Sequence, residues 1–148
     1  MKKFFLIFIF LLSECGYQPI FLNKNLNDME FNKITSEGDI EINRKVLRSL
    51  SFKENNLKNK LNNLLINSTF NILETSKNSQ GKVESYKAEI NLNLIISNKE
   101  KVISSKNFMK EFSYNTKDNK SELVRYQNEI KDILINKVIE DIILFMNI

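Results

Sequence analysis

The chain has 148 residues, of which 42% are hydrophobic and 27% charged, a balance that suits one folded domain and argues against wholesale disorder. Its net charge of +4 becomes +3 once Lys2, Lys3 and Glu14 are removed with a leader, which is too weak to predict nucleic-acid binding but favours an acidic partner such as a phosphorylated lipid head group. The absence of histidine and the single cysteine exclude an imidazole-based triad, a thiolate metal cluster and an internal disulfide.

The amino terminus has the pattern of a secretory leader. Two lysines precede an unbroken apolar run, Phe4 to Leu12, which is shorter than the roughly 20 residues that span a bilayer. Cys15 stands where a lipoprotein signal places the thiol that accepts a diacylglycerol, so we predict a signal peptide over residues 1–14 and lipidation of Cys15. Glu14 departs from the small residue usual before that cysteine, and the alternatives are an ordinary leader followed by a buried cysteine, or a short core helix.

The next segment leads from this leader into the domain. Residues 15–27 contain the only proline and are predicted to be a lipidated tether, so the folded domain covers residues 28–148. Alternation predicts a first strand over residues 29–35, ended by Glu37-Gly38-Asp39. Helical spacing then predicts a short helix over residues 42–50, with Asp39 or Asn43 as its N-cap. Its basic residues are interpreted as a solvated face rather than a binding site: Arg44, Lys45 and Arg48.

The segment from residue 53 to 67 fits two patterns. Its leucines at 57, 61, 64 and 65 fit a continuing helix, whereas Ile66, Ser68, Phe70 and Ile72 begin a strand alternation. We predict a strand from about Leu64 to Thr75, followed by a hairpin loop over residues 77–82.

The clearest pattern is a hairpin further along. Residues 86–96 alternate between apolar and polar, which predicts an antiparallel strand with one buried and one wet face. Residues 97–100 form a predicted turn, and residues 101–114 return with Val102, Phe108, Phe112 and Tyr114 on one face. Lys106 and Lys110 interrupt that face, so this strand is either bulged or projects beyond the core.

The last element is a long amphipathic helix over residues 121–146, with Asn119 and Glu122 as its capping box. Late apolar residues widen its surface, either for core packing or for a partner: Ile139, Ile143, Leu144 and Met146. Its predicted stripe is Leu123, Tyr126, Ile130, Ile133, Leu134, Val138, Ile142 and Phe145. The element order β-α-β-β-β-α predicts an α+β two-layer sandwich, in which two helices cover a small, mainly antiparallel sheet of about four strands.

Two stretches of the chain resemble a known family. Cys15-Gly16-Tyr17-Gln18-Pro19-Ile20-Phe21 is similar to the start of the LptE family of lipopolysaccharide-assembly lipoproteins. Phe112-Ser113-Tyr114-Asn115, followed by a long helix with Glu129 and Glu140-Asp141-Ile142, looks like that family's end. The resemblance implies an outer-membrane, lipid-anchored protein facing the periplasm. It also implies a role as plug and assembly partner of the LptD β-barrel in lipopolysaccharide transport to the outer leaflet, with acylation at Cys15.

Residue chemistry adds candidate contacts with lipopolysaccharide phosphates, since lysine ammonium groups offer them charge-assisted hydrogen bonds. The candidates lie on two loops and one strand, and each has solvation as its ordinary alternative: Lys77, Lys82, Lys99, Lys101, Lys106 and Lys110. The polar face from Lys87 to Asn93 either touches a barrel wall or faces water.

The sequence bears on two other classes of function. A generic periplasmic pilot or accessory lipoprotein of another envelope export machine fits the same leader and fold. An enzyme such as an envelope hydrolase has little support, because the sequence has no histidine, no glycine-rich phosphate loop and no nucleophile elbow; a glycosidase-type pair of carboxylates is the alternative that stays open. The acidic pair Glu140-Asp141 is expected to be solvated on the helix surface. We therefore predict no catalytic residue, no cofactor, no metal ligand and no nucleic-acid partner.

Overall fold

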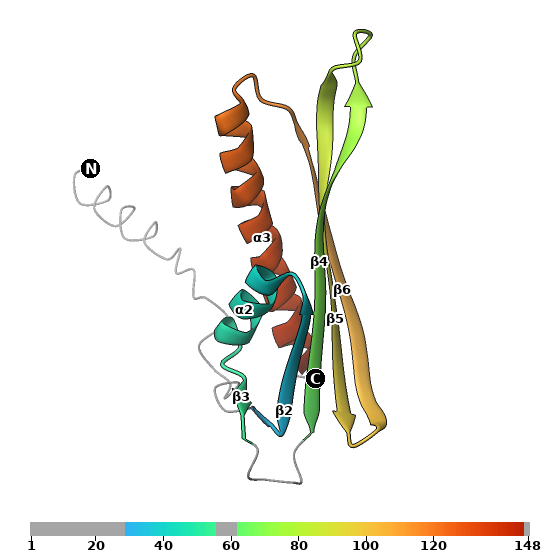
Figure 1. Ribbon diagram of the computed structural model, residues 1–148, viewed down its shortest axis with the longest axis vertical. Helices are drawn as coiled ribbons and strands as arrows, with labels where there is room; N and C mark the ends of the chain where they lie inside the picture. Colours follow the sequence, from blue (N-terminus) through green and yellow to red (C-terminus); the bar gives the residue numbers. More distant parts are fainter. Residues whose placement is uncertain (1–28, 56–61, 147–148) are drawn as a thin grey trace, which may run out of the picture.

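The computed structural model describes residues 29–55 and 62–146, which form a sheet with two helices on one of its faces (Figure 1). The predicted signal peptide, the tether, Cys15 and the leucines at 57 and 61 lie outside the described residues. The elements in chain order are β1 (Glu30–Phe31), β2 (Lys33–Gly38), α2 (Ile40–Ser49), β3 (Lys53–Glu54), β4 (Asn63–Lys77), β5 (Val83–Asn98), β6 (Lys101–Asn115) and α3 (Lys120–Met146).

The main sheet has four strands in the order β2-β4-β5-β6. The strands β4, β5 and β6 form an antiparallel meander, whereas β2 runs parallel to β4. The predicted α+β sandwich, with two helices over a mainly antiparallel sheet, is confirmed. Within the described residues, no helix is long and apolar enough to span a membrane.

The predicted first strand over residues 29–35 is instead two strands. The break falls at Asn32, whose backbone N–H donates to the carbonyl of Asn62 at 2.8 Å. The two-residue strand β1 pairs with β3, and β2 then joins the main sheet beside β4. A local alternation pattern does not reveal such a change of partner, because both pieces are extended.

Asp39 caps α2, which settles the choice between Asp39 and Asn43. Its Oδ1 accepts hydrogen bonds from the backbone N–H groups of Glu41 and Ile42 at 2.9 and 3.0 Å. Gly38, with φ of +82°, turns the chain from β2 into this cap. The Asn43 side chain is buried and bonds the carbonyl of Glu37, so it holds the helix against the sheet.

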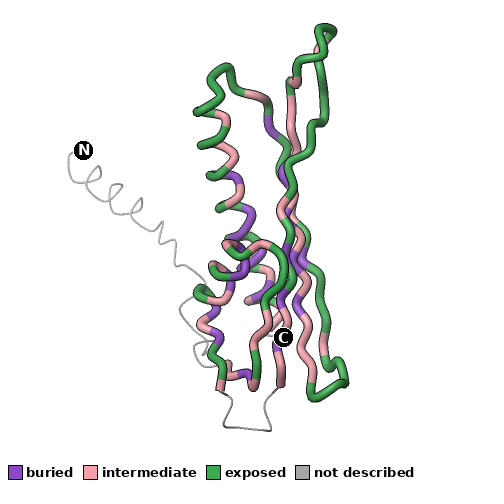
Figure 2. The backbone as a smooth tube through the Cα atoms, viewed as in Figure 1, coloured by how far each residue is buried: buried purple, intermediate pink, exposed green. Residues whose placement is uncertain are grey.

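The core lies between the helices and one face of the sheet (Figure 2). Leu64, Ile66, Ile90, Leu92 and Leu94 supply the sheet's side of it, and all are almost fully buried. The predicted stripe of α3 is correct in most positions, with one correction. Ile133 is 51% exposed, and the buried residues on that turn and the next are Leu134, Ile135, Val138 and Ile139. The stripe is rotated because α3 packs against α2 as well as against β5 and β6.

The long hairpins carry the sheet beyond the helices. The end of β4 and the start of β5 extend past the amino-terminal end of α3, and residues 71–77 are all exposed (Figures 1 and 2). The strand β6 contains a bulge, since its register against β5 shifts between Ile96 and Ser97, but the bulge does not lie at Lys106 or Lys110, which keep a regular register opposite Leu94 and Ile90. The bulge places Val102 opposite Ser97 rather than on the face of Phe108, which corrects the predicted alternation of this strand.

Candidate functional site

The loop lysines predicted to contact phosphate do not converge. Lys82 and the end of β4 with Lys77 lie at one end of the sheet, whereas Lys99 and Lys101 lie at the β5–β6 turn at the opposite end (Figure 1). All four side chains are exposed, and Lys77 is paired with Glu74 at 2.9 Å. These four lysines therefore form no single anion site within the described residues.

The two strand lysines lie together on the helix-side face of β6. Lys106 stands opposite Leu94, and Lys110 stands opposite Ile90. Lys110 Nζ lies 2.7 Å from Asp141 Oδ2 on α3, so Asp141 is bridged to the sheet and half-buried, not simply solvated as predicted. Among the described residues, Lys106 makes no hydrogen bond or ion pair and keeps its hydrogen-bonding capacity.

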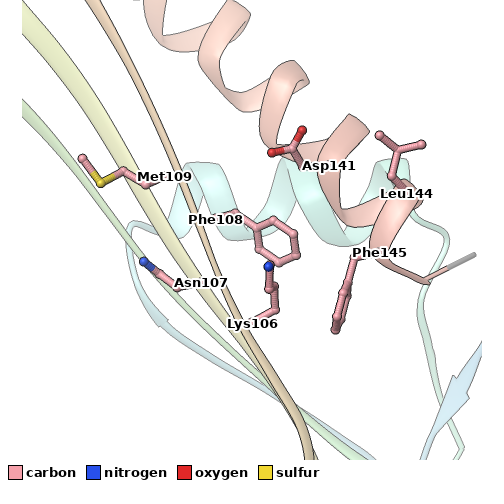
Figure 3. Close-up of a pocket in the computed structure, with 7 residues that line it drawn as sticks. All are labelled: Lys106, Asn107, Phe108, Met109, Asp141, Leu144 and Phe145. Carbon is pink, nitrogen blue, oxygen red and sulfur yellow. The ribbon is translucent and has the colours of Figure 1, made fainter. Parts of the chain in front are cut away.

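A groove of about 420 Å³ lies where β6 meets the end of α3 (Figure 3). From α3 it is lined by Asp141, Leu144 and Phe145, and from β6 by Lys106 to Met109. Figure 3 shows Lys106 and Phe108 on the helix side of β6, with Asn107 and Met109 on its other side. The groove therefore includes the edge of the strand, and Lys106 is the free cation beside its apolar wall.

Sequence reasoning identified parts of this groove separately. Lys106 is one of the predicted phosphate contacts. Leu144 belongs to the predicted wide apolar surface of α3, and its side chain is 62% exposed. The role of Phe145 as a wall was missed, because its ring packs edge-to-face on Phe108, 37 positions earlier in the chain (145 − 108), with centroids 5.8 Å apart. No local pattern signals such a contact.

The middle of the sheet's outer face, which carries no helix, is polar and uncharged on β4, β5 and β6. Paired residues share a face, so Asn67, Asn93 and Asn107 form a row across β4, β5 and β6. The next row is Thr69, Asn91 and Met109. We call these two rows the asparagine face. The wet face predicted from Lys87 to Asn93 is thus one strip of a three-stranded polar surface.

The charged groups beside the asparagine face are one lysine and two glutamates, which are paired with one another. Lys87 Nζ lies 3.5 Å from Glu89 and 3.2 Å from Glu111, across the β5–β6 pair. The pKa of Lys87 is raised, chiefly by the hydrogen bond and charge of Glu111. This cluster keeps one net negative charge, with its lysine held between the two carboxylates.

A second ion network joins α2 to α3. Lys131 Nζ lies 3.0 Å from Asp39 and 2.8 Å from Glu41, and only 15% of its side chain is exposed. Burial would raise the pKa of Asp39, but the hydrogen bonds from the Ile42 N–H and Lys131 hold it below its ordinary value. The hydrogen bond from Lys131 likewise lowers the pKa of Glu41. Carboxylates held ionised in this way suit a structural clamp better than acid–base catalysis.

The basic residues of α2 divide between two surroundings. Lys45 belongs to the clamp, because its Nζ lies 3.1 Å from Glu41 and 2.5 Å from Asp132. Arg44 and Arg48 are exposed, as predicted, and line a smaller hollow of about 260 Å³. In the part of the chain that the structure describes, no cluster of three or more acidic or cysteine side chains is arranged to hold a metal ion.

The fold is shared with solved lipoproteins. The rare lipoprotein B of Shewanella oneidensis superposes with a TM-score of 0.57 at 13% identity, over 78% of this chain and 96% of that one. The minor lipoprotein of Acinetobacter baumannii gives a TM-score of 0.57 at 13% identity, over 78% and 90%. An uncharacterized lipoprotein B of Nitrosomonas europaea gives 0.55 at 12% identity, over 82% and 86%.

These likenesses establish the fold, and at such low identity they carry over no residue's role. No family model matches the sequence, and no curated protein matches it either. The chain thus has a fold found in lipoproteins, reached by a widely divergent sequence.

Proposed function

We propose that this chain is an outer-membrane lipoprotein that plugs an LptD-type β-barrel and assists its assembly for lipopolysaccharide transport. The proposal rests on one combination of observations. The motif Cys15-Gly16-Tyr17-Gln18-Pro19, with its LptE-like spacing, stands ahead of a domain whose fold occurs in solved lipoproteins. In this proposal Cys15 is acylated, the domain faces the periplasm, and the protein acts by binding rather than by catalysis.

The asparagine face is the surface proposed to lie against the barrel wall. The interior of a large outer-membrane barrel is polar, and the centres of protein interfaces are depleted of charge. The side-chain amides of Asn93 and Asn107 make no hydrogen bond among the described residues, so they are free to bond such a wall. This argument favours a plug over a freely solvated domain.

Lipopolysaccharide contact is proposed for lysines that have no ion-pair partner. Lys77 and Lys110 are engaged by Glu74 and Asp141, which already neutralise them. A phosphate gains most from an ammonium group that is not already paired. The remaining candidates are Lys82, Lys99, Lys101 and Lys106.

Affinity purification of the tagged full-length chain in detergent tests the proposal. We expect a large outer-membrane barrel to co-purify, and depletion of the protein to leave lipopolysaccharide in the inner membrane. Intact mass of the membrane-extracted chain should show cleavage after Glu14 and acylation of Cys15, and Cys15→Ala should abolish the added mass. If the chain purifies alone while lipopolysaccharide reaches the cell surface normally, the plug proposal is wrong.

Charge insertion tests the surface. Asn93→Lys places a charge in the centre of the asparagine face, and we expect it to reduce recovery of the barrel about tenfold. Asn136→Lys is the matched control, because Asn136 is exposed on α3 away from the sheet pairing. Equal recovery with both variants would contradict contact through this face. A crosslinked partner that is not a barrel would favour an accessory lipoprotein of another export machine.

A further inference from the structure

The strand β6 has a free edge along its whole length. It pairs with β5 from Lys101 to Asn115, and the described residues place no strand on its other side. Alternate backbone N–H and C=O groups of an edge strand point outward without a ladder partner. A 15-residue edge is thus a template on which another extended segment can form hydrogen bonds.

This edge is apolar for an exposed strand. Val102 and Ile103 are each 55% exposed, Met109 is 50% exposed and Phe112 is 39% exposed. Leu144 of α3 is 62% exposed and lines the groove together with Met109. An extended segment laid along β6 would cover this apolar surface while it satisfied the outward backbone groups.

Charge selects among the possible occupants. A second copy pairing antiparallel about Phe108 would bring Lys106 opposite Lys110 of the other copy, which is already bridged to Asp141, so that copy would offer Lys106 no free carboxylate. The chain's own residues 16–27 contain Lys24 and no acidic residue, so they offer Lys106 no counter-ion. Because Asp141 already neutralises Lys110, the unpaired charges of the edge are Lys101 at the β5–β6 turn and Lys106 beside the groove. The complementary occupant carries an acidic side chain.

We infer that the free edge of β6 binds an extended segment of a partner protein as an added strand. An acidic residue of the partner's segment lies opposite Lys106. An apolar residue two positions away in that segment lies opposite Phe108, over the groove. Both pairs share the helix-side face because side chains in paired strands alternate together. The spacing acid-x-apolar is the same for a parallel or an antiparallel partner. Lys106 also rejects basic segments, which gives the edge selectivity.

A short probe tests this edge without barrel or lipopolysaccharide, so its outcome is independent of the proposed function. The probe is the capped peptide Thr-Val-Thr-Glu-Thr-Val-Thr, which presents acid-x-apolar in either direction. One control peptide has Lys in place of Glu. The other is N-methylated at Glu and at the following Thr, which blocks backbone hydrogen bonding on both of its edges. Binding to the full-length chain in detergent is followed by fluorescence anisotropy and by hydrogen exchange of the β6 amides.

We expect the acidic peptide to bind and to protect amides of β6, and both control peptides to fail. Lys106→Glu should weaken binding about tenfold, and Leu144→Ser about fivefold. Lys137→Glu, the same charge change at an exposed position of α3, should leave binding unchanged.

Three results would overturn the inference. The first is binding of the N-methylated peptide as tight as that of the parent, since no strand would then be added. The second is equal weakening by Lys106→Glu and Lys137→Glu, which would indicate attraction by net charge alone. The third is protection of the outward β6 amides before peptide is added. Sedimentation would then assign the covering to a second copy if the chain is dimeric, or to the chain itself if it is monomeric.

Discussion

Two glycines with the same backbone conformation offer a matched test of how α2 is joined to the sheet. Gly38 has φ of +82° and Gly81 has φ of +80°, so alanine meets the same backbone strain at both positions. The surroundings differ. A Cβ on Gly38 would lie 1.9 Å from the carbonyl oxygen of Ser68, whereas a Cβ on Gly81 would meet nothing within 4 Å.

The magnitude follows from what must move. The left-handed conformation costs alanine about 1 kcal/mol relative to glycine at either position. At Gly38, relief of the overlap also displaces the Ser68 carbonyl, which accepts the Asp39 N–H at 2.9 Å. The lost hydrogen bond adds about 1 kcal/mol, and the backbone shift adds about 1–2 kcal/mol. We therefore expect Gly38→Ala to lower the free energy of unfolding by about 3–4 kcal/mol, and Gly81→Ala by about 1 kcal/mol.

Urea denaturation followed by circular dichroism measures both values on the same scale. If Gly38→Ala loses no more stability than Gly81→Ala, the close approach of β2 to Ser68 is not what requires glycine. A large loss at Gly81 would equally contradict the reasoning, because only backbone strain acts there.

Three further outcomes concern the contacts around this junction. Ser68→Ala removes the hydroxyl that lies 2.8 Å from Asn43 Oδ1, leaves a buried acceptor unpaired and should lower the free energy of unfolding by about 1–3 kcal/mol in urea. Lys131→Met should cost about 2 kcal/mol by the same assay, because it leaves Asp39 and Glu41 without their shared ammonium group. The wild type should lose stability as pH falls below about 4.5, and Lys131→Met should lose less over that range.

The sign of the pH effect follows from the direction of the shifts. The pKa values of Asp39 and Glu41 lie below their ordinary values of 3.8 and 4.5 in the folded protein. Their stabilisation is therefore present above those ordinary values and is lost as pH falls through the folded pKa values. If the free energy of unfolding falls equally with pH in the wild type and in Lys131→Met, the ion pairs of Lys131 with Asp39 and Glu41 contribute nothing to acid sensitivity. For Ser68, an unchanged midpoint would mean that Asn43 finds another donor.

The sequence by itself determined the local elements and their order. Period-two alternation located β4, β5 and β6 to within a few residues, and helical spacing located α2 and α3. These patterns are readable because each reports which side of its own element faces a core. They sufficed for the class of fold and for the polar character of the open sheet face.

Only the tertiary structure decided which elements meet. The parallel pairing of β2 with β4, the bridge from Lys110 to Asp141 and the packing of Phe108 on Phe145 join residues about 30 or more positions apart. The two hairpin loops carried lysines of similar appearance, yet the fold placed them at opposite ends of the sheet. Lys106 differs from the other lysines because Leu144 and Phe145, at the end of α3, form an apolar wall beside it. Its neighbour on the same face, Lys110, is paired with Asp141, whereas Lys106 is not. Periodicity describes one element at a time, and a site between two elements exists only once their packing fixes its distances.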